Sequence, residues 1–295
     1  MKKIVLIILA LGFIGISACK KESTTTTTTT PTTNPGTTFL ASTTPMKKSA
    51  VLEDFTGVRC GYCPDGHTIA KAMETANPGK VVVICVHTGS YAEPSSGWAN
   101  FTTPFGAAIA GQTALTGFPA GTVNRQVFSG FGQTAGGTAM SRSKWATAAS
   151  QVMLENAPVN IGAKATYNAS SKVLTVKVDL YYTANETLPN NINVAFLQNN
   201  LISKQSGGTP DPNNYVQNNV LRHLLTGQWG EVVPATSTKT GTKYSKTYTY
   251  TVPADYNGAT IPPGGGAVNI ANCDVAVFVA RGQKEILNAV KVKVQ

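Results

Sequence analysis

Two cysteines separated by two residues carry the clearest chemical signal in this chain. The segment Cys60-Gly61-Tyr62-Cys63 follows directly on the apolar run 51–55, as a strand that leads into a helix would. Thiol–disulfide chemistry uses cysteines at this spacing. The N-terminus of the helix favours a thiolate, because its N–H groups are unpaired and its dipole is positive there. The second cysteine is close enough to form a reducible disulfide with the first.

The residues around the cysteines predict a strand–helix–strand unit that positions them. Residues 51–55 read as a buried strand, 67–76 as a helix with one apolar face, and 80–87 as a second, parallel strand. The cysteines then fall at the carboxyl edge of a sheet, where α/β proteins place their sites. The same reasoning predicts a helix at 105–115, a strand at 121–128 and a helix at 141–156.

The N-terminus predicts export and a lipid anchor. A basic start is followed by the apolar run 4–16, which is too short to span a bilayer and ends at Ser17-Ala18-Cys19. We expect residues 1–18 to be a lipoprotein signal peptide and Cys19 to be lipidated, a plain cleaved signal being the alternative. Residues 19–48 are rich in threonine and predict a disordered tether. The absence of Asp after Cys19 favours the outer membrane, reached through the lipid anchor and without a transmembrane helix.

Composition limits the remaining possibilities. The chain has 295 residues and a formal net charge of +10, half of which lies before residue 49. The remainder is only mildly basic and has no cluster of basic and aromatic side chains, so we expect no nucleic-acid partner. Its length predicts two domains.

Cysteines and histidines are also potential metal ligands. Cys60, Cys63 and His67 would supply three ligands, but structural zinc needs four and no second cysteine pair exists. Cys85 lies in an apolar strand, which predicts a buried, inert thiol; it and Cys273 are expected to be free. We therefore predict no metal and no cofactor.

The second half changes character near Pro158 and predicts an all-β domain. Alternating strands separated by Gly, Pro and Asn clusters are typical of an immunoglobulin-like sandwich, here residues 157–295. No catalytic arrangement stands out in it. The strands expected are 172–182, 192–197, 244–252, 273–280 and 286–294.

The segment 51–64 resembles the active-site segment of thioredoxin-like proteins. The resemblance implies a thioredoxin-like α/β domain over residues 49–156. Asp54 matches the buried aspartate that assists proton transfer in that family, and Pro119 matches the cis-proline that faces the disulfide. Arg59 stands where the family has tryptophan, and Tyr62 where it has proline. Arg59 would favour a thiolate at Cys60 and make the disulfide more oxidising.

The chain as a whole resembles the Bacteroidetes outer-membrane lipoproteins related to the twenty-eight-kilodalton outer membrane protein. The signal, the lipid cysteine, the threonine tether, the CGYCP segment and the stretches 215–222 and 227–230 carry this resemblance. It implies a location and an architecture, in a family associated with surface adhesion. A thioredoxin-like fold does not by itself establish redox catalysis.

Two hypotheses for the function follow. In the first, the protein exchanges disulfides with envelope protein thiols, with Cys60 as nucleophile, Cys63 as resolving thiol and Asp54 as proton-transfer aid. Pro119 would line the substrate groove and Arg59 would stabilise the thiolate. In the second, the protein is a non-enzymatic surface adhesin or binding lipoprotein with a structural Cys60–Cys63 disulfide. Its surface ligand would then be met by loops of the sandwich.

Overall fold

The computed structural model describes residues 38–256 and 266–295. The predicted signal peptide, the lipidation site Cys19 and residues 20–37 of the predicted tether lie outside the described residues. Residues Phe39–Gln295 form one compact unit.

The first half of this unit carries the helices. They are α1 (Cys63–Ala76), α2 (Gly106–Gly111) and α3 (Trp145–Leu154), the last preceded by a 3-10 turn, Arg142–Lys144. The strands of this half are β1 (Ala50–Thr56), β2 (Val81–His87), β3 (Ala120–Val123) and β4 (Met140–Ser141).

The second half consists mainly of strands. The long ones are β5 (Val159–Asn168), β6 (Val173–Tyr182), β7 (Asn190–Gln198), β12 (Lys243–Thr251), β13 (Cys273–Arg281) and β14 (Ile286–Lys293). The short ones are β8 (Leu201–Ser203), β9 (Tyr215–Gln217), β10 (Val220–Leu224) and β11 (Glu231–Val232). Two 3-10 turns also occur here, Ala235–Ser237 and Ile270–Asn272.

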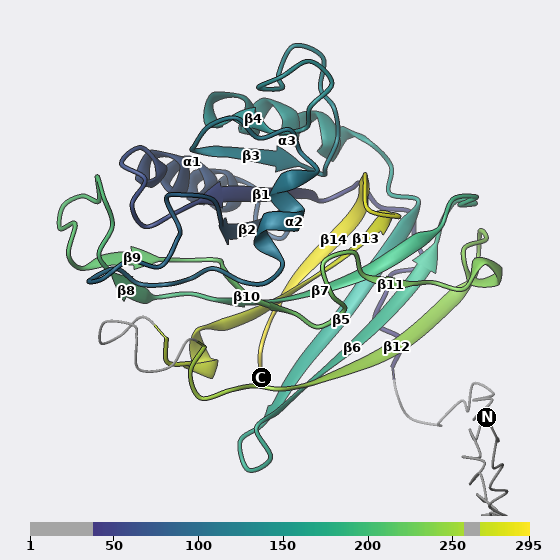
Figure 1. Ribbon diagram of the computed structural model, residues 1–295. Helices are drawn as coiled ribbons and strands as arrows, with labels where there is room; N and C mark the ends of the chain where they lie inside the picture. Colours follow the sequence, from purple (N-terminus) through teal and green to yellow (C-terminus); the bar gives the residue numbers. More distant parts are fainter. Residues whose placement is uncertain (1–37, 257–265) are drawn as a thin grey trace, which may run out of the picture. The chain divides into compact units, whose positions relative to one another are not determined.

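A mixed nine-stranded sheet joins strands from both halves (Figure 1). Its order is β14-β13-β7-β10-β2-β1-β3-β4, and β11 pairs with β7. Strands β1 and β2 are parallel, as the strand–helix–strand pattern predicts. The halves meet where β10 runs parallel to β2: Val220 is paired with Cys85, whose N–H donates to the Asn219 carbonyl at 2.8 Å.

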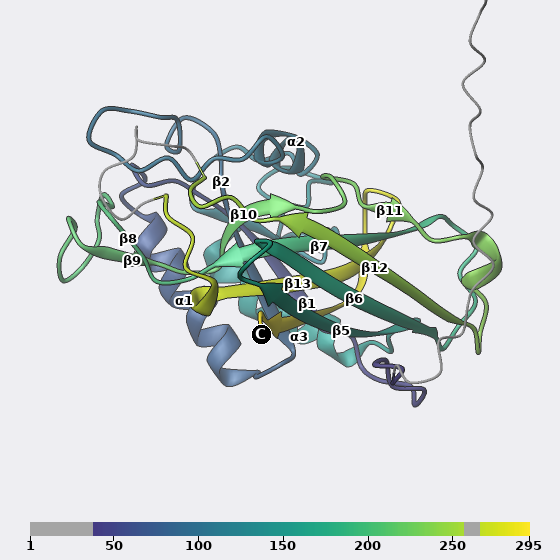
Figure 2. The ribbon, with the colours of Figure 1, turned by 90° about the horizontal axis from the view of Figure 1, so that it is seen from below.

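Three apolar clusters hold the layers together. On one face of β1 and β2, helices α1 and α3 pack around Leu52 and Trp145. On the other face, α2 and strands β7, β10, β13 and β14 share one cluster with Phe55 and Phe278. Farther along the sheet, the three-stranded sheet β12-β6-β5 packs on β7 and β13 (Figure 2).

The fold is thus mostly β with few helices and a mixed sheet. A sandwich-like packing of two sheets exists in the second half. The finer prediction, a thioredoxin-like domain at 49–156 followed by a separate immunoglobulin-like sandwich at 157–295, is not confirmed. One sheet and one apolar cluster cross residue 156, because β10 pairs with β2 and β7 extends that pairing.

The predicted tether differs from the structure at its C-terminal end. Residues 39–48 lie against the fold: the Leu40 N–H donates to the buried carboxylate of Asp179 at 2.7 Å. The Asn160 amide donates to the Ser42 and Thr44 carbonyls, and Lys48 forms ion pairs with glutamates of two distant segments. Long-range polar partners, which composition does not reveal, order this stretch.

Two element boundaries differ from the predicted ones because of residues at those boundaries. Helix α1 begins at Cys63, four residues before its predicted start, because proline fits the first turn of a helix and Pro64 stands there. The strand predicted at 121–128 ends at Val123, because Asn124 and Arg125 take positive φ values of 48° and 51°.

Candidate functional site

The cysteine pair lies where β1 ends and α1 begins. Cys60 and Cys63 form a disulfide with an S–S distance of 2.04 Å, and the helix starts at the second cysteine. Both residues are buried, with 2% and 0% of their surface exposed, whereas Tyr62 between them is 73% exposed. Little of either cysteine is therefore exposed, although Tyr62 in the turn between them is.

The connection between β8 and β9, residues 204–214, covers this turn. The Gln205 side-chain amide donates to the carbonyls of Gly57 and Cys60 at 3.2 and 3.0 Å, and the Ser206 N–H donates to the Val58 carbonyl at 2.8 Å. Gly207 follows with a φ of 70°.

Gly207 contacts the cysteine turn so closely that only glycine fits. A Cβ atom at Gly207 would lie 2.0 Å from the Gly61 carbonyl oxygen, and its positive φ also favours glycine. We call residues 205–207 the cover of the disulfide.

The other residues predicted to act on the disulfide take different positions. The Phe118–Pro119 peptide bond is cis, as the thioredoxin resemblance implies, and Pro119 lies against Gly66 of α1. The Arg59 guanidinium donates to the Ser90 carbonyl. This contact ties Arg59 to the loop after β2, and no contact with sulfur is found for it among the described residues.

Asp54 lies on β1 and is completely buried. Burial raises its pKa to about 8, although a hydrogen bond from Cys85 opposes the rise. Burial lowers the pKa of the neighbouring His67 to about 4. At pH 7 the carboxyl is therefore mostly protonated and the imidazole neutral, so the 3.9 Å contact between Asp54 Oδ2 and His67 Nε2 is not an ion pair.

Cys85, predicted to be inert, forms a buried group with Asp54 and His67. Its Sγ lies 3.9 Å from Asp54 Oδ2, because Asp54 and Cys85 are register partners on β1 and β2. Burial raises the pKa of the Cys85 thiol well above its ordinary value, and the nearby Asp54 and Glu74 carboxyls raise it further. Cys85 and Cys273 are both free, as predicted.

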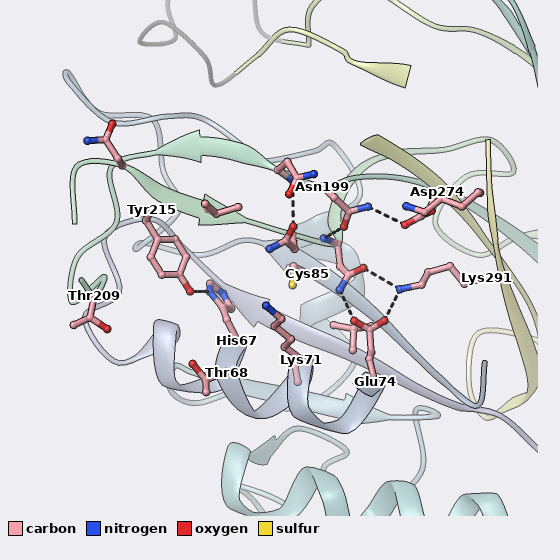
Figure 3. Close-up of a pocket in the computed structure, with 18 of the residues that line it drawn as sticks. His67, Thr68, Lys71, Glu74, Cys85, Asn199, Thr209, Tyr215, Asp274 and Lys291 are labelled. Atoms are coloured by element: carbon pink, nitrogen blue, oxygen red, sulfur yellow. Dashed lines mark hydrogen bonds and ion pairs between the residues drawn. The ribbon is translucent and has the colours of Figure 1, made fainter. Parts of the chain in front are cut away.

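A cavity of about 850 Å³ opens beside this group, between α1, β9 and the ends of β13 and β14. Figure 3 shows the side chains of His67 and Cys85 facing it, with the Tyr215 hydroxyl hydrogen bonded to His67. Five asparagines line it: Asn199, Asn200, Asn214, Asn218 and Asn219.

The charges around the cavity balance. Its lining contains three lysines and three acids: Lys71, Lys291, Lys293, Glu74, Asp211 and Asp274. Two pairs form directly, Lys291 with Glu74 and Lys293 with Asp274, the latter at 2.9 Å. The cavity thus offers amides and paired charges rather than a net charge of one sign.

Sequence reasoning missed the cover and the cavity. In the sequence, Gly207 can be recognised only as a turn residue. No local sequence pattern connects Gln205 with Cys60, which lies 145 positions earlier. Cys85 was visible, but its apolar neighbours predicted an inert core residue.

A family model described as outer membrane protein Omp28 matches residues 107–295, more than half of the chain. This chain belongs to the Omp28 family. The match confirms the resemblance seen in the sequence and makes the protein a member of an outer-membrane protein family. No curated protein matches it.

Two solved structures resemble this chain over most of its length. HBP35 of Porphyromonas gingivalis is 22% identical, with a TM-score of 0.63 over 84% of this chain and 76% of that one. Protein AGR_C_4864 from Agrobacterium tumefaciens is 13% identical, with a TM-score of 0.50 over 83% and 94%. These likenesses show a shared fold.

A domain of the outer membrane lipoprotein Omp28 from Porphyromonas gingivalis also matches. It is 23% identical over 47% of this chain and 89% of that one, with a TM-score of 0.31. Within residues 38–256 and 266–295, no helix has the length and apolar character needed to cross a bilayer.

Proposed function

We propose that this Omp28-family protein is a lipid-anchored, non-enzymatic binding protein of the outer membrane, in which the Cys60–Cys63 disulfide is structural. Lipidation at Cys19 and a tether over residues 19–38 would attach the compact unit to the membrane. The ligand would be taken up by the cavity beside α1 rather than by the cysteines.

One observation carries this proposal: the disulfide is covered. Disulfide exchange requires a thiolate to reach a sulfur atom of the disulfide. Cys60 is almost completely buried, and the cover donates hydrogen bonds to the carbonyls of Gly57, Val58 and Cys60. A buried disulfide that resists attack is a structural one.

The cavity supports a neutral, polar ligand. Asparagine amides both donate and accept hydrogen bonds, and five of them line the cavity. The lysines and acids there balance, which gives no advantage to an anion or a cation. Hydroxyl-rich molecules such as sugars match this lining, with the Tyr215 ring as an apolar surface.

The decisive experiment measures the reduction potential of the Cys60–Cys63 pair together with disulfide reductase turnover, with Cys60→Ala as the control. We expect a potential below about −300 mV and no turnover above that of the control. A potential above about −230 mV with turnover that depends on Cys60 would overturn the proposal in favour of an exchange enzyme.

The ligand is tested with an array of neutral and anionic glycans. We expect the full chain to bind neutral glycans and Tyr215→Ala to lose that binding. Tyr62→Ala is the matched control, because this exposed tyrosine lies outside the cavity. Equal binding by both variants, or preference for anionic glycans, would contradict the cavity assignment.

A second candidate is thiol–disulfide exchange with envelope proteins, which the state of Asp54 favours. A buried carboxyl with a pKa of about 8 can hold or release a proton near neutral pH. In this reading, the cover would have to leave the cysteine turn before exchange. The same potential and turnover measurements decide between the two candidates.

A further inference from the structure

Three potential metal ligands converge beside the cavity, outside the cysteine pair. They are the carboxyl group of Asp54 on β1, the imidazole of His67 on α1 and the thiol of Cys85 on β2. One ligand atom from each lies within 4.8 Å of the other two. Asp54 Oδ2 lies 3.9 Å from both His67 Nε2 and Cys85 Sγ.

We infer that Asp54, His67 and Cys85 bind a zinc-type divalent metal ion and leave its fourth position open to the cavity. Carboxylate oxygen, imidazole nitrogen and thiolate sulfur are the atoms that zinc selects in proteins. Bond lengths of about 2.0–2.3 Å place the ligand atoms of a tetrahedral site roughly 3.3–3.8 Å apart. The two separations of 3.9 Å thus need to shrink by a few tenths of an ångström, and the separation between His67 and Cys85, which is within 4.8 Å, by about 1 Å at most.

An independent observation points to an absent partner at this place. The second carboxyl oxygen of Asp54, Oδ1, is buried and has no hydrogen-bond partner among the described residues. Both ring nitrogens of His87 share this condition, and His87 is register-paired with Thr56, two positions along the strands from the Asp54–Cys85 pair. Buried polar atoms nearly always have a hydrogen-bond partner, and these three atoms have none among the described residues.

The surroundings of His67 resemble those of a metal-bound histidine. Its Nδ1 is 3.0 Å from the Tyr215 hydroxyl, which can accept the proton of that nitrogen. Metal-ligating histidines usually donate their other ring N–H in this way, which orients the ring. Nε2 is held by the Thr56 hydroxyl at 2.9 Å, a hydrogen bond that metal binding would replace.

The cavity explains why the site would have an open position. His67 and Cys85 both line it, whereas Asp54 is not among the lining residues. Zinc sites with three protein ligands keep the fourth position for water or a bound molecule. A metal ion here could therefore contact a ligand in the cavity. This inference does not depend on the identity of that ligand.

The three ligands differ from the set that the sequence suggested. Cys60 and Cys63 are joined in a disulfide and offer no thiolate, which leaves His67 as the shared member. Cys85 supplies the sulfur instead, and both the Cys85 thiol and the Asp54 carboxyl must release a proton to solvent when the metal binds.

Cobalt(II) titration of the full chain with the disulfide oxidised tests the inference. We expect one Co²⁺ per chain, with a near-ultraviolet thiolate-to-cobalt absorption band that Zn²⁺ abolishes by displacing the cobalt. The band should vanish in Cys85→Ser and persist in Cys273→Ser, the matched control, because Cys273 is the other free buried cysteine. Tyr215→Phe should weaken Zn²⁺ binding roughly 10-fold.

A measurement on the unaltered chain guards against a variant that fails to fold. Peptide mass mapping after alkylation should show that Zn²⁺ slows labelling of Cys85 and leaves Cys273 unchanged. Absence of the cobalt band in the unaltered chain, persistence of the band in Cys85→Ser, or equal labelling of Cys85 with and without Zn²⁺ would each overturn the inference.

Discussion

Two cysteine regions lie beside α1, the Cys60–Cys63 motif and Cys85, and the sequence suggests the opposite role for each from the one that the structure supports. The Cys60–Cys63 motif has the spacing of a redox site, yet the cover closes it. Cys85 sits in an apolar strand, yet it lines a cavity together with His67. Both contrasts come from β8, β9 and the loop between them: the loop closes over the disulfide, while Tyr215 of β9 borders the cavity. The neighbouring segments, and not the residue type, distinguish the two regions.

The largest expected effect comes from removing the cover with Gly207→Ala. The added methyl group would meet the Gly61 carbonyl at 2.0 Å, so the loop has to move away. We expect the rate of Cys60–Cys63 reduction by dithiothreitol to rise roughly 100-fold, which corresponds to ~3 kcal/mol of lost closed-loop stability.

Gly227→Ala is the matched control for this change. Gly227 has nearly the same φ, 69°, but nothing lies within 4 Å of a Cβ atom there. Equal reduction rates in the two variants would show that the cover does not protect the disulfide.

Replacing both cysteines of the pair tests whether the disulfide is structural. For a loop this short, chain-entropy arguments give ~2 kcal/mol of stabilisation. We therefore expect Cys60→Ala with Cys63→Ala to lower the free energy of unfolding in urea by about 2 kcal/mol. An unchanged free energy of unfolding would show that the Cys60–Cys63 disulfide does not stabilise the fold.

Gln205→Ala should give a smaller effect on the same reduction rate. It removes donors to the Gly57 and Cys60 carbonyls, each worth about 1 kcal/mol. Some of this loss is recovered by water, so we expect reduction to accelerate about 10-fold. Gln126→Ala serves as control, because Gln126 bonds to Glu285 near the opposite end of β1. A reduction rate as slow as that of the control would mean that packing of the cover, and not these hydrogen bonds, protects the disulfide.

Tyr215→Phe should have the smallest effect and shows whether the two regions are independent. It removes the hydroxyl that bonds to His67 Nδ1 and keeps the ring. We expect the free energy of unfolding to change by about 1 kcal/mol or less, and the reduction rate of the disulfide to stay the same. A clear acceleration of reduction would mean that the cavity and the cover move together.

Much of the fold could be predicted locally. Alternating side chains marked β6, β12 and β14, and the spacing of Ala70 and Met73 marked the buried face of α1. Strand β5 was missed, and the short strands β8–β11 carry too few residues for a clear period. The union of both halves in one sheet rests on a single register pair, Val220 with Cys85, which no local pattern reveals.

The sequence by itself determined the family, the cysteine spacing and the strand–helix–strand unit that brings Cys63 to the start of a helix. These features depend on residues close together in the chain, where hydrophobic period and turn residues are informative. The tertiary structure alone decided which cysteine lies under the cover and which one lines the cavity. Gln205 closes over Cys60 and Tyr215 reaches His67 across more than a hundred residues, because burial depends on how distant segments pack and not on local composition.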